Sequence, residues 1–209
     1  MNTKSEDEDV IFTSDLFELS LLLNPEDPVH KRGIMFSFFI HPVQRAAILF
    51  EYLKSAQHEP SFHSDIATMS LLDYARDRAN HRRDTSGHIS LRESNFLVRS
   101  LSQVPLDVPL HGGHVAHAEQ MLRKFCLVGL VDSEDAFVKS WKRIQKLFDW
   151  EGDYNCIKAF FPTDAQKLVQ EDSEEYRLLA EFNEYDMMFY DNIKTVFDEQ
   201  GSIPLFSDV

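Results

Sequence analysis

Two short and almost entirely apolar runs constrain the fold of this chain more than any other feature. Residues 34–40 read IMFSFFI, and residues 126–131 read CLVGLV. Apolarity that continues over six or seven residues is typical of parallel strands covered by helices on both faces. A segment with helical period follows the first run, and such segments flank the second. The sequence therefore predicts an α/β fold with a parallel sheet. A further strand is predicted at residues 10–13.

Helical periodicity is clear in four segments. Residues 42–53 begin with Pro42, which suits a first helical turn. Residues 115–125 and 137–148 lie on either side of the second apolar run. Near the end, one long helix is predicted, opened by Asp172 with Glu175 three residues on and closed by Gly201. One face of this helix is apolar and consists of Leu178, Phe182, Tyr185, Phe189, Ile193 and Val196.

The whole chain is consistent with one domain. It has 209 residues, of which 43% are apolar, and this is enough to fill a single core. There is no internal repeat and no low-complexity linker, so we assign residues 1–209 to one domain that is helix-rich overall. The acidic residues 1–9 are expected to be disordered. Cys126 is expected to be a small buried hydrophobe.

The charge of the chain disfavours several kinds of partner. It has 35 acidic and 21 basic residues, a formal net charge of −14, which repels nucleic acids and anionic lipid surfaces. The one basic cluster, Arg76, Arg78, Arg82 and Arg83, is interrupted by acidic residues. We interpret it as a solvated face or loop, and the alternative is a patch that contacts sulfate or phosphate. No apolar stretch approaches the ~20 residues that span a bilayer, and the N-terminus does not resemble a signal peptide.

The junction after the first apolar run is the best candidate for a binding site. There a predicted strand leads directly into a helix, and helix N-termini at such junctions bind anions in open α/β sheets. His41 and Arg45 lie at this junction. His41 is also a plain helix-entry position, an alternative that the sequence leaves open.

Residues 36–53, FSFFIHPVQRAAILFEYL, carry a family resemblance. They resemble the segment of carbohydrate and membrane-associated sulfotransferases in which a strand ends in Arg-x-Pro-x-x-Arg-x-x-Ser. Residues 94–101, 119–150 and 176–200 are similar to three further segments of that family, in the same order. The resemblance implies a three-layer P-loop-type sheet. It also implies transfer of a sulfuryl group from 3′-phosphoadenosine-5′-phosphosulfate to a carbohydrate hydroxyl, with no metal.

The resemblance also implies roles for individual residues. Arg45 matches the second arginine of the segment that grips the 3′-phosphate of the donor, and His41 is its neighbour in the candidate cofactor site. Arg99 matches a position that contacts substrate or donor; the alternative is an exposed arginine on a short helix. No catalytic residue can be nominated. Members of this family usually work at the Golgi membrane, but the sequence leaves the compartment open.

Two departures from the family pattern indicate impaired activity. Ile40 and Ile48 stand where the family has its first phosphate-gripping arginine and its serine. No glycine precedes Gly33, so the phosphate loop and the first strand are expected to be missing from this chain. We therefore expect sulfotransferase activity to be weak or absent in this chain alone. The alternative is a non-catalytic module that binds a protein partner through an unpaired sheet edge or the acidic face.

The motif HGGHVAH, with His111, His114 and His117, invites a metal-site interpretation. One helix cannot place all three histidines on one face, because three-residue steps drift around a helix with 3.6 residues per turn. Gly112 and Gly113 suggest that the helix begins only after them. We interpret the motif as a polar loop and helix cap and assign no metal site.

Overall fold

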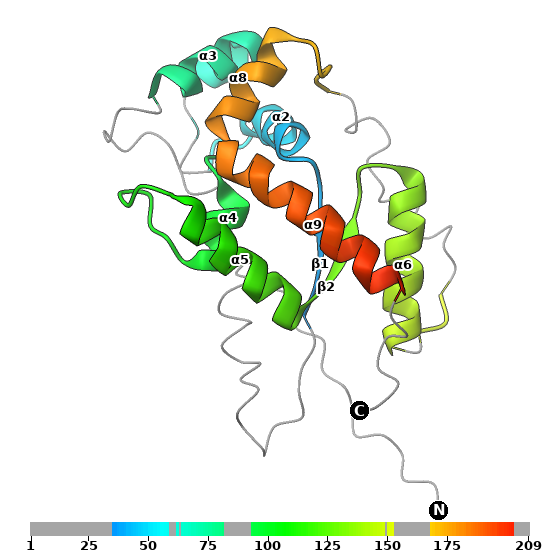
Figure 1. Cartoon of the computed structure of the whole chain (residues 1–209). Coiled ribbons are helices and arrows are strands. Elements are labelled where there is room, and N and C mark those ends of the chain that lie inside the picture. Colours follow the sequence, from blue (N-terminus) through cyan, green and yellow to red (C-terminus); the bar gives the residue numbers. More distant parts are fainter. Residues whose placement is uncertain are drawn as a thin grey trace, which may run out of the picture.

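The computed structural model describes residues 35–58, 62, 64–81, 93–148, 150–152 and 168–202. Two strands, β1 (Met35–Phe39) and β2 (Cys126–Leu130), pair in parallel, with Met35 opposite Cys126. They lie in the middle of a helix-rich fold (Figure 1). The parallel pair confirms the α/β class that the two apolar runs predicted. The predicted strand at residues 10–13 and the acidic residues 1–9 lie outside the described residues.

Helices make up most of the remaining described chain. In sequence order they are α2 (Pro42–Leu53), the 3-10 helix η1 (Ser64–Thr68), α3 (Leu71–His81), α4 (Phe96–Ser102), α5 (Gly112–Phe125), α6 (Glu134–Phe148), α8 (Glu174–Phe182) and α9 (Glu184–Ser202). The predicted helices at residues 42–53, 115–125 and 137–148 are confirmed. A second apolar cluster, separate from the core around the sheet, joins α2, η1, α3 and α8.

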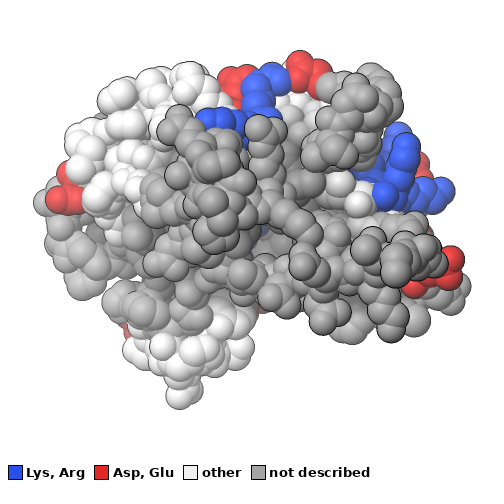
Figure 2. Space-filling model, turned by 90° about the horizontal axis from the view of Figure 1, so that it is seen from below, with Lys and Arg blue, Asp and Glu red and all other residues white. Residues whose placement is uncertain are grey.

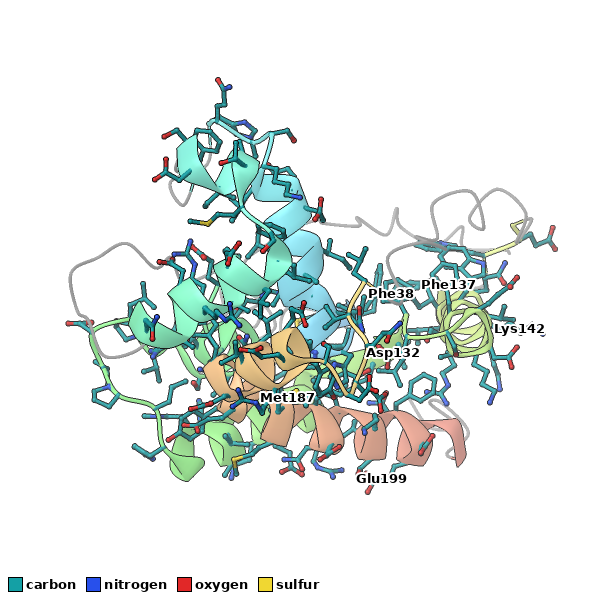
Figure 3. All side chains as sticks on the ribbon, turned by 90° about the horizontal axis from the view of Figure 1, so that it is seen from above. Phe38, Asp132, Phe137, Lys142, Met187 and Glu199 are labelled. Carbon is teal, nitrogen blue, oxygen red and sulfur yellow. The ribbon has the colours of Figure 1, made fainter. Side chains whose placement is uncertain are left out.

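The side chains of β1 alternate between two layers of helices. Met35 and Phe39 are buried in a core that they share with α4, α5 and α9. Phe38 points to the other face, where its ring centroid lies 5.6 Å from that of Phe137 on α6 (Figure 3). Helices therefore cover both faces of the sheet, as the continuous apolarity of the strands predicted.

The edge of β2 that faces away from β1 is occupied by side chains. The Nε2 of Gln200, on α9, donates to the carbonyl of Cys126 at 2.8 Å, and the N–H of Val128 donates to Oε1 of the same amide at 2.9 Å. Farther along, the N–H of Leu130 donates to Oγ of Ser140, on α6, at 2.8 Å. The expectation of an unpaired sheet edge is therefore wrong on the β2 side.

The long C-terminal helix is divided in two, which the sequence did not predict. Asn183 separates α8 from α9. The first of these helices is capped by Ser173, not by Asp172, because Oγ of Ser173 accepts the N–H of Tyr176 at 3.1 Å. The apolar period runs through the break without interruption, so the cause is tertiary: the side chain of Asn95 caps the start of α9.

The basic cluster on α3 is only partly solvated. Arg78 is buried, and its Nε lies 2.5 Å from Oε2 of Glu93. The hydroxyl of Tyr74 donates to the same carboxylate at 2.9 Å. Arg76 is exposed and pairs with Glu174 on α8 at 3.0 Å. The interpretation as a solvated face is thus wrong for Arg78, because the α3 side that carries it packs inward; the other two arginines of the cluster lie outside the described residues.

Candidate functional site

The two strands end side by side, and the residues that follow them form the candidate site. The N–H of Val131 donates to the carbonyl of Phe39 at 3.0 Å, so the ladder continues just past β2. The next residue, Asp132, accepts the backbone N–H of His41 on Oδ1 at 2.8 Å. This contact joins the loop after β2 to the turn between β1 and α2. Figure 3 shows Asp132 between the ribbons of α2 and α9.

Two tyrosines from the C-terminal helices enclose this junction. The hydroxyl of Tyr190, on α9, donates to Oδ2 of Asp132, and its ring meets the His41 ring edge-on, with centroids 5.3 Å apart. Tyr176, on α8, stacks on His41 with centroids 5.8 Å apart and an interplanar angle of 24°. Its hydroxyl lies 3.4 Å from Nε2 of His41. The strand ends are therefore lined by one imidazole, one carboxylate and two phenols.

His41 is the N-cap of α2, which agrees with its interpretation as a helix-entry residue. Its Nδ1 accepts the N–H of Val43 at 3.3 Å, so the ring proton of the neutral imidazole belongs on Nε2. Burial, and then the nearby charge of Lys194, lower the pKa of His41. The ring is thus neutral near pH 7, but its only basic nitrogen is already occupied by the cap. This geometry makes His41 a poor general base.

Both oxygens of Asp132 accept hydrogen bonds from other elements. Burial raises its pKa, while the N–H of His41 and the charge of Lys194 lower it. One oxygen holds the β1–α2 turn and the other holds Tyr190. The carboxylate therefore connects the turn before α2 with α9.

Arg45 lies on the first turns of α2, close to His41, whose carbonyl accepts the N–H of Arg45 at 2.9 Å. Its guanidinium stacks over the ring of Phe96 on α4, with its central carbon 4.2 Å from the ring centroid. Its charge is also one of the influences that lower the pKa of the buried Asp186. The structure thus brings the two candidate cofactor-site residues together on one turn and places Arg45 beside the start of α4.

The two aliphatic residues that depart from the family pattern lie on either side of Arg45 in sequence. Ile40 follows β1, and Ile48 is three residues beyond Arg45 on α2. Both are only partly buried, and neither belongs to the two core clusters. They are therefore not needed to fill the interior, and their side chains offer no hydrogen-bond donor to an anion.

A buried polar clasp, formed by Asn95, Asn183 and Asp186, joins α4 to the start of α9. Oδ1 of Asn95 accepts the N–H of Asp186 at 3.1 Å, and the N–H of Asn95 donates to Oδ1 of Asn183 at 2.9 Å. The carboxylate of Asp186 accepts the N–H groups of Leu97 and Val98 at 3.0 and 2.9 Å. Each helix start is thus capped by a side chain from the other helix. Burial raises the pKa of Asp186 to about 6.

Arg99, the candidate substrate residue, forms hydrogen bonds with backbone carbonyls of a nearby loop. It lies on the seven-residue helix α4 and is half-buried. Its Nη1 donates to the carbonyls of Pro105 and Val108, the latter at 3.1 Å. These contacts fasten the connector between α4 and α5, which we call the 103–110 connector. The alternative, an exposed arginine on a short helix, is correct for the short helix. The side chain is however half-buried and bonded to the connector.

Sequence reasoning missed Asp132 and the partners of the C-terminal motif. Asn183, Asp186 and Tyr190 lie in the segment at residues 176–200 that carries the resemblance, at steps of three and four residues. Their partners lie 58 to 91 residues away in the chain, and no local pattern names them. A polar residue directly after an apolar strand, such as Asp132, is the signal that could have indicated the site.

Metal ligands, membrane-spanning helices, surface charge and similarity to known proteins each bear on the kind of site. Within the described residues, no group of three or more histidine, cysteine or acidic side chains could hold a metal ion, and no helix is long and apolar enough to cross a membrane. On the face in Figure 2, basic side chains form small groups beside acidic ones.

No model of a known protein family matches the chain, and no curated protein or solved structure is significantly similar to it.

Proposed function

We propose that this chain is a sulfotransferase-type domain of the P-loop α/β class in which the grip on the sulfate donor has been weakened. One observation carries the proposal: the polar residues of the motif segments are each other's partners. Arg45 stacks on Phe96, and Asp132 binds Tyr190. Likewise, Asn95 of one segment binds Asn183 of another. The matched segments thus pack against one another, as they would in a domain of this family.

The reaction of such a domain is sulfuryl transfer. The bond between sulfur and the bridging oxygen of the phosphosulfate breaks, a bond forms between sulfur and an acceptor hydroxyl oxygen, and the hydroxyl proton leaves to a base. The leaving group is adenosine 3′,5′-bisphosphate. A carbohydrate hydroxyl is the acceptor that the resemblance favours. We assign no base, because the basic nitrogen of His41 is occupied by the N–H of Val43.

Recognition of the 3′-phosphate would rest on few groups. Arg45 supplies a cation, and the N-terminus of α2 supplies a favourable dipole. Ile40 and Ile48 supply neither charge nor hydrogen bond. Each missing polar or charge-assisted contact costs about 1–3 kcal/mol. Since about 1.4 kcal/mol is a tenfold change in affinity, donor binding should be weaker by orders of magnitude than with the full set of contacts.

Calorimetric titration with adenosine 3′,5′-bisphosphate tests this proposal. We expect the wild-type chain to bind with a Kd weaker than about 10 μM, and the double variant I40R/I48S to bind at least about tenfold more tightly. Both positions are partly exposed, so the new side chains have room. The gain should vanish when Arg45 is also replaced by Ala.

Adenosine 5′-monophosphate is the matched ligand control, because it lacks the 3′-phosphate. An equal gain for both ligands would mean that the new arginine attracts anions without selecting the donor. Tight binding by the wild-type chain would contradict the weakened grip. If I40R/I48S gains nothing, the proposal fails, and a non-catalytic module becomes the better interpretation.

A further inference from the structure

The start of α5 is capped by two histidines instead of the usual hydroxyl and carboxylate. His111 is the N-cap, and its Nδ1 accepts the N–H of Gly113 at 3.1 Å. His114, three residues on, accepts the N–H of His111 on Nδ1 at 3.2 Å. The two imidazoles lie on each other, with ring centroids 3.7 Å apart. Together they form a reciprocal capping box. The helix therefore begins at Gly112, earlier than the glycines in the sequence suggested.

This geometry fixes the tautomer of both rings in their neutral form. Each Nδ1 is used as an acceptor, so each neutral ring carries its hydrogen on Nε2. A further proton on either ring has to be added at Nδ1, where it would face a backbone N–H. The cap bond cannot survive that change. The positive end of the helix dipole also opposes an imidazolium at this place.

The surrounding charges act in the same direction. Burial and the nearby charges of His111, Arg99 and His117 lower the pKa of His114. Arg99 comes from α4 and His117 from the next turn of α5. Two acidic groups, Asp186 of α9 and Asp107 of the connector, act on Arg99. Because the folded protein disfavours the charged ring, the stability from this cap is full above about pH 6.5 and is lost as pH falls.

The cap directly follows the 103–110 connector in the chain. Arg99 binds the carbonyls of Pro105 and Val108 in that connector, and Leu110 at its end is buried in the core around the sheet. Leu106 and Val108, at its centre, are exposed apolar residues. Loss of the cap would leave the connector fastened at the Arg99 end.

We propose that the His111–His114 capping box is an acid-sensitive latch, which holds the first turn of α5 at neutral pH and releases it at mildly acidic pH. The latch is separate from the donor site and does not depend on the proposed function.

Two neighbouring glycines provide a matched pair of variants. A methyl group at Gly113 would lie 2.9 Å from Cε1 and 3.0 Å from Nδ1 of His111, whereas one at Gly112 would have no heavy atom within 4 Å. G113A should therefore displace the His111 ring and open the latch even at neutral pH. G112A should keep the latch, since alanine is otherwise favoured over glycine in a helix.

Amide hydrogen exchange of residues 112–115, corrected for intrinsic rates, measures the latch. In the wild-type chain we expect protection to fall about tenfold between about pH 7.5 and about pH 5.5. G112A should behave like the wild type, and G113A should already be unprotected at the higher pH. In H111S/H114E, which restores a hydroxyl and carboxylate capping box, protection should be independent of pH. H117Q should leave the pH dependence in place.

Two results would overturn the latch. One is wild-type protection that does not change between the two pH values. The other is an equal fall in H111S/H114E, which would place the acid-sensitive group elsewhere. Imidazole ¹⁵N shifts at the higher pH provide an independent check, because both rings must be protonated on Nε2.

Discussion

Asp186 is a carboxylate that the fold buries completely. Its oxygens accept two N–H groups of α4, and Arg45 and Arg99 lie near enough to favour its charge, yet burial outweighs these influences. Its pKa rises from an ordinary value of 3.8 to about 6. Between these two values the folded protein binds a proton that the unfolded chain does not. The stability from this group is therefore full below about pH 4 and is lost as pH rises through about 6.

Replacing Asp186 with Asn should remove this titration. We expect the free energy of unfolding of the wild type to decrease by about 3 kcal/mol between about pH 4 and pH 7 relative to that of D186N. Urea titrations at both pH values measure the difference. D191N, on an exposed carboxylate of α9, is the control, and parallel pH profiles for wild type and D186N would refute the prediction.

Individual residues could be predicted from the sequence only where the chain marks them locally. His41 and Arg45 stand out because a strand, a proline and a helical period follow one another within a few residues. Asp132 is marked only by its position directly after an apolar run, and no local pattern names its partner His41, which is 91 residues away. Arg99 illustrates the opposite problem: its place in a motif was evident, but its carbonyl partners depend on how the connector folds back.

At the scale of elements, the apolar pattern predicted the strands and helices that pack in the core. It did not predict the helix boundaries that are set by capping side chains. Both described strands and the helices beside them follow the apolar runs. The break at Asn183 and the start of α5 at Gly112 do not, because each is fixed by polar side chains: Asn95 in the first case and His111 with His114 in the second. Periodicity contains no information about such contacts.

Gln200 offers a test at this scale, because its amide forms the hydrogen bonds to β2 that a neighbouring strand would form. We expect Q200A to destabilise the protein by about 1–3 kcal/mol, since the N–H of Val128 and the carbonyl of Cys126 lose their partners. T195A is a suitable control on the same helix, because Thr195 is exposed and bonds only within its own turn. Urea titration compares them. Equal stability of Q200A and T195A would mean that water replaces the amide without cost.

The whole molecule carries a formal charge of −14, and this repulsion opposes the compact state. We expect the thermal midpoint to rise by about 2–4 °C as NaCl increases from about 20 mM to about 300 mM, a change that corresponds to about 1 kcal/mol in a chain of this length. Calorimetry or circular dichroism measures it. A midpoint that stays constant or falls would mean that attractive ion pairs, such as that of Arg76 with Glu174, outweigh the repulsion.

Side chains cover the edge of β2 at which a further strand of the sheet would pair. Gln200 and Ser140 already occupy positions that a new neighbour of β2 would need. A strand added beside β2 would therefore have to displace both side chains, whether it came from this polypeptide or from another molecule. Within the part of the chain that the structure describes, the parallel pair is closed to a further strand on this side.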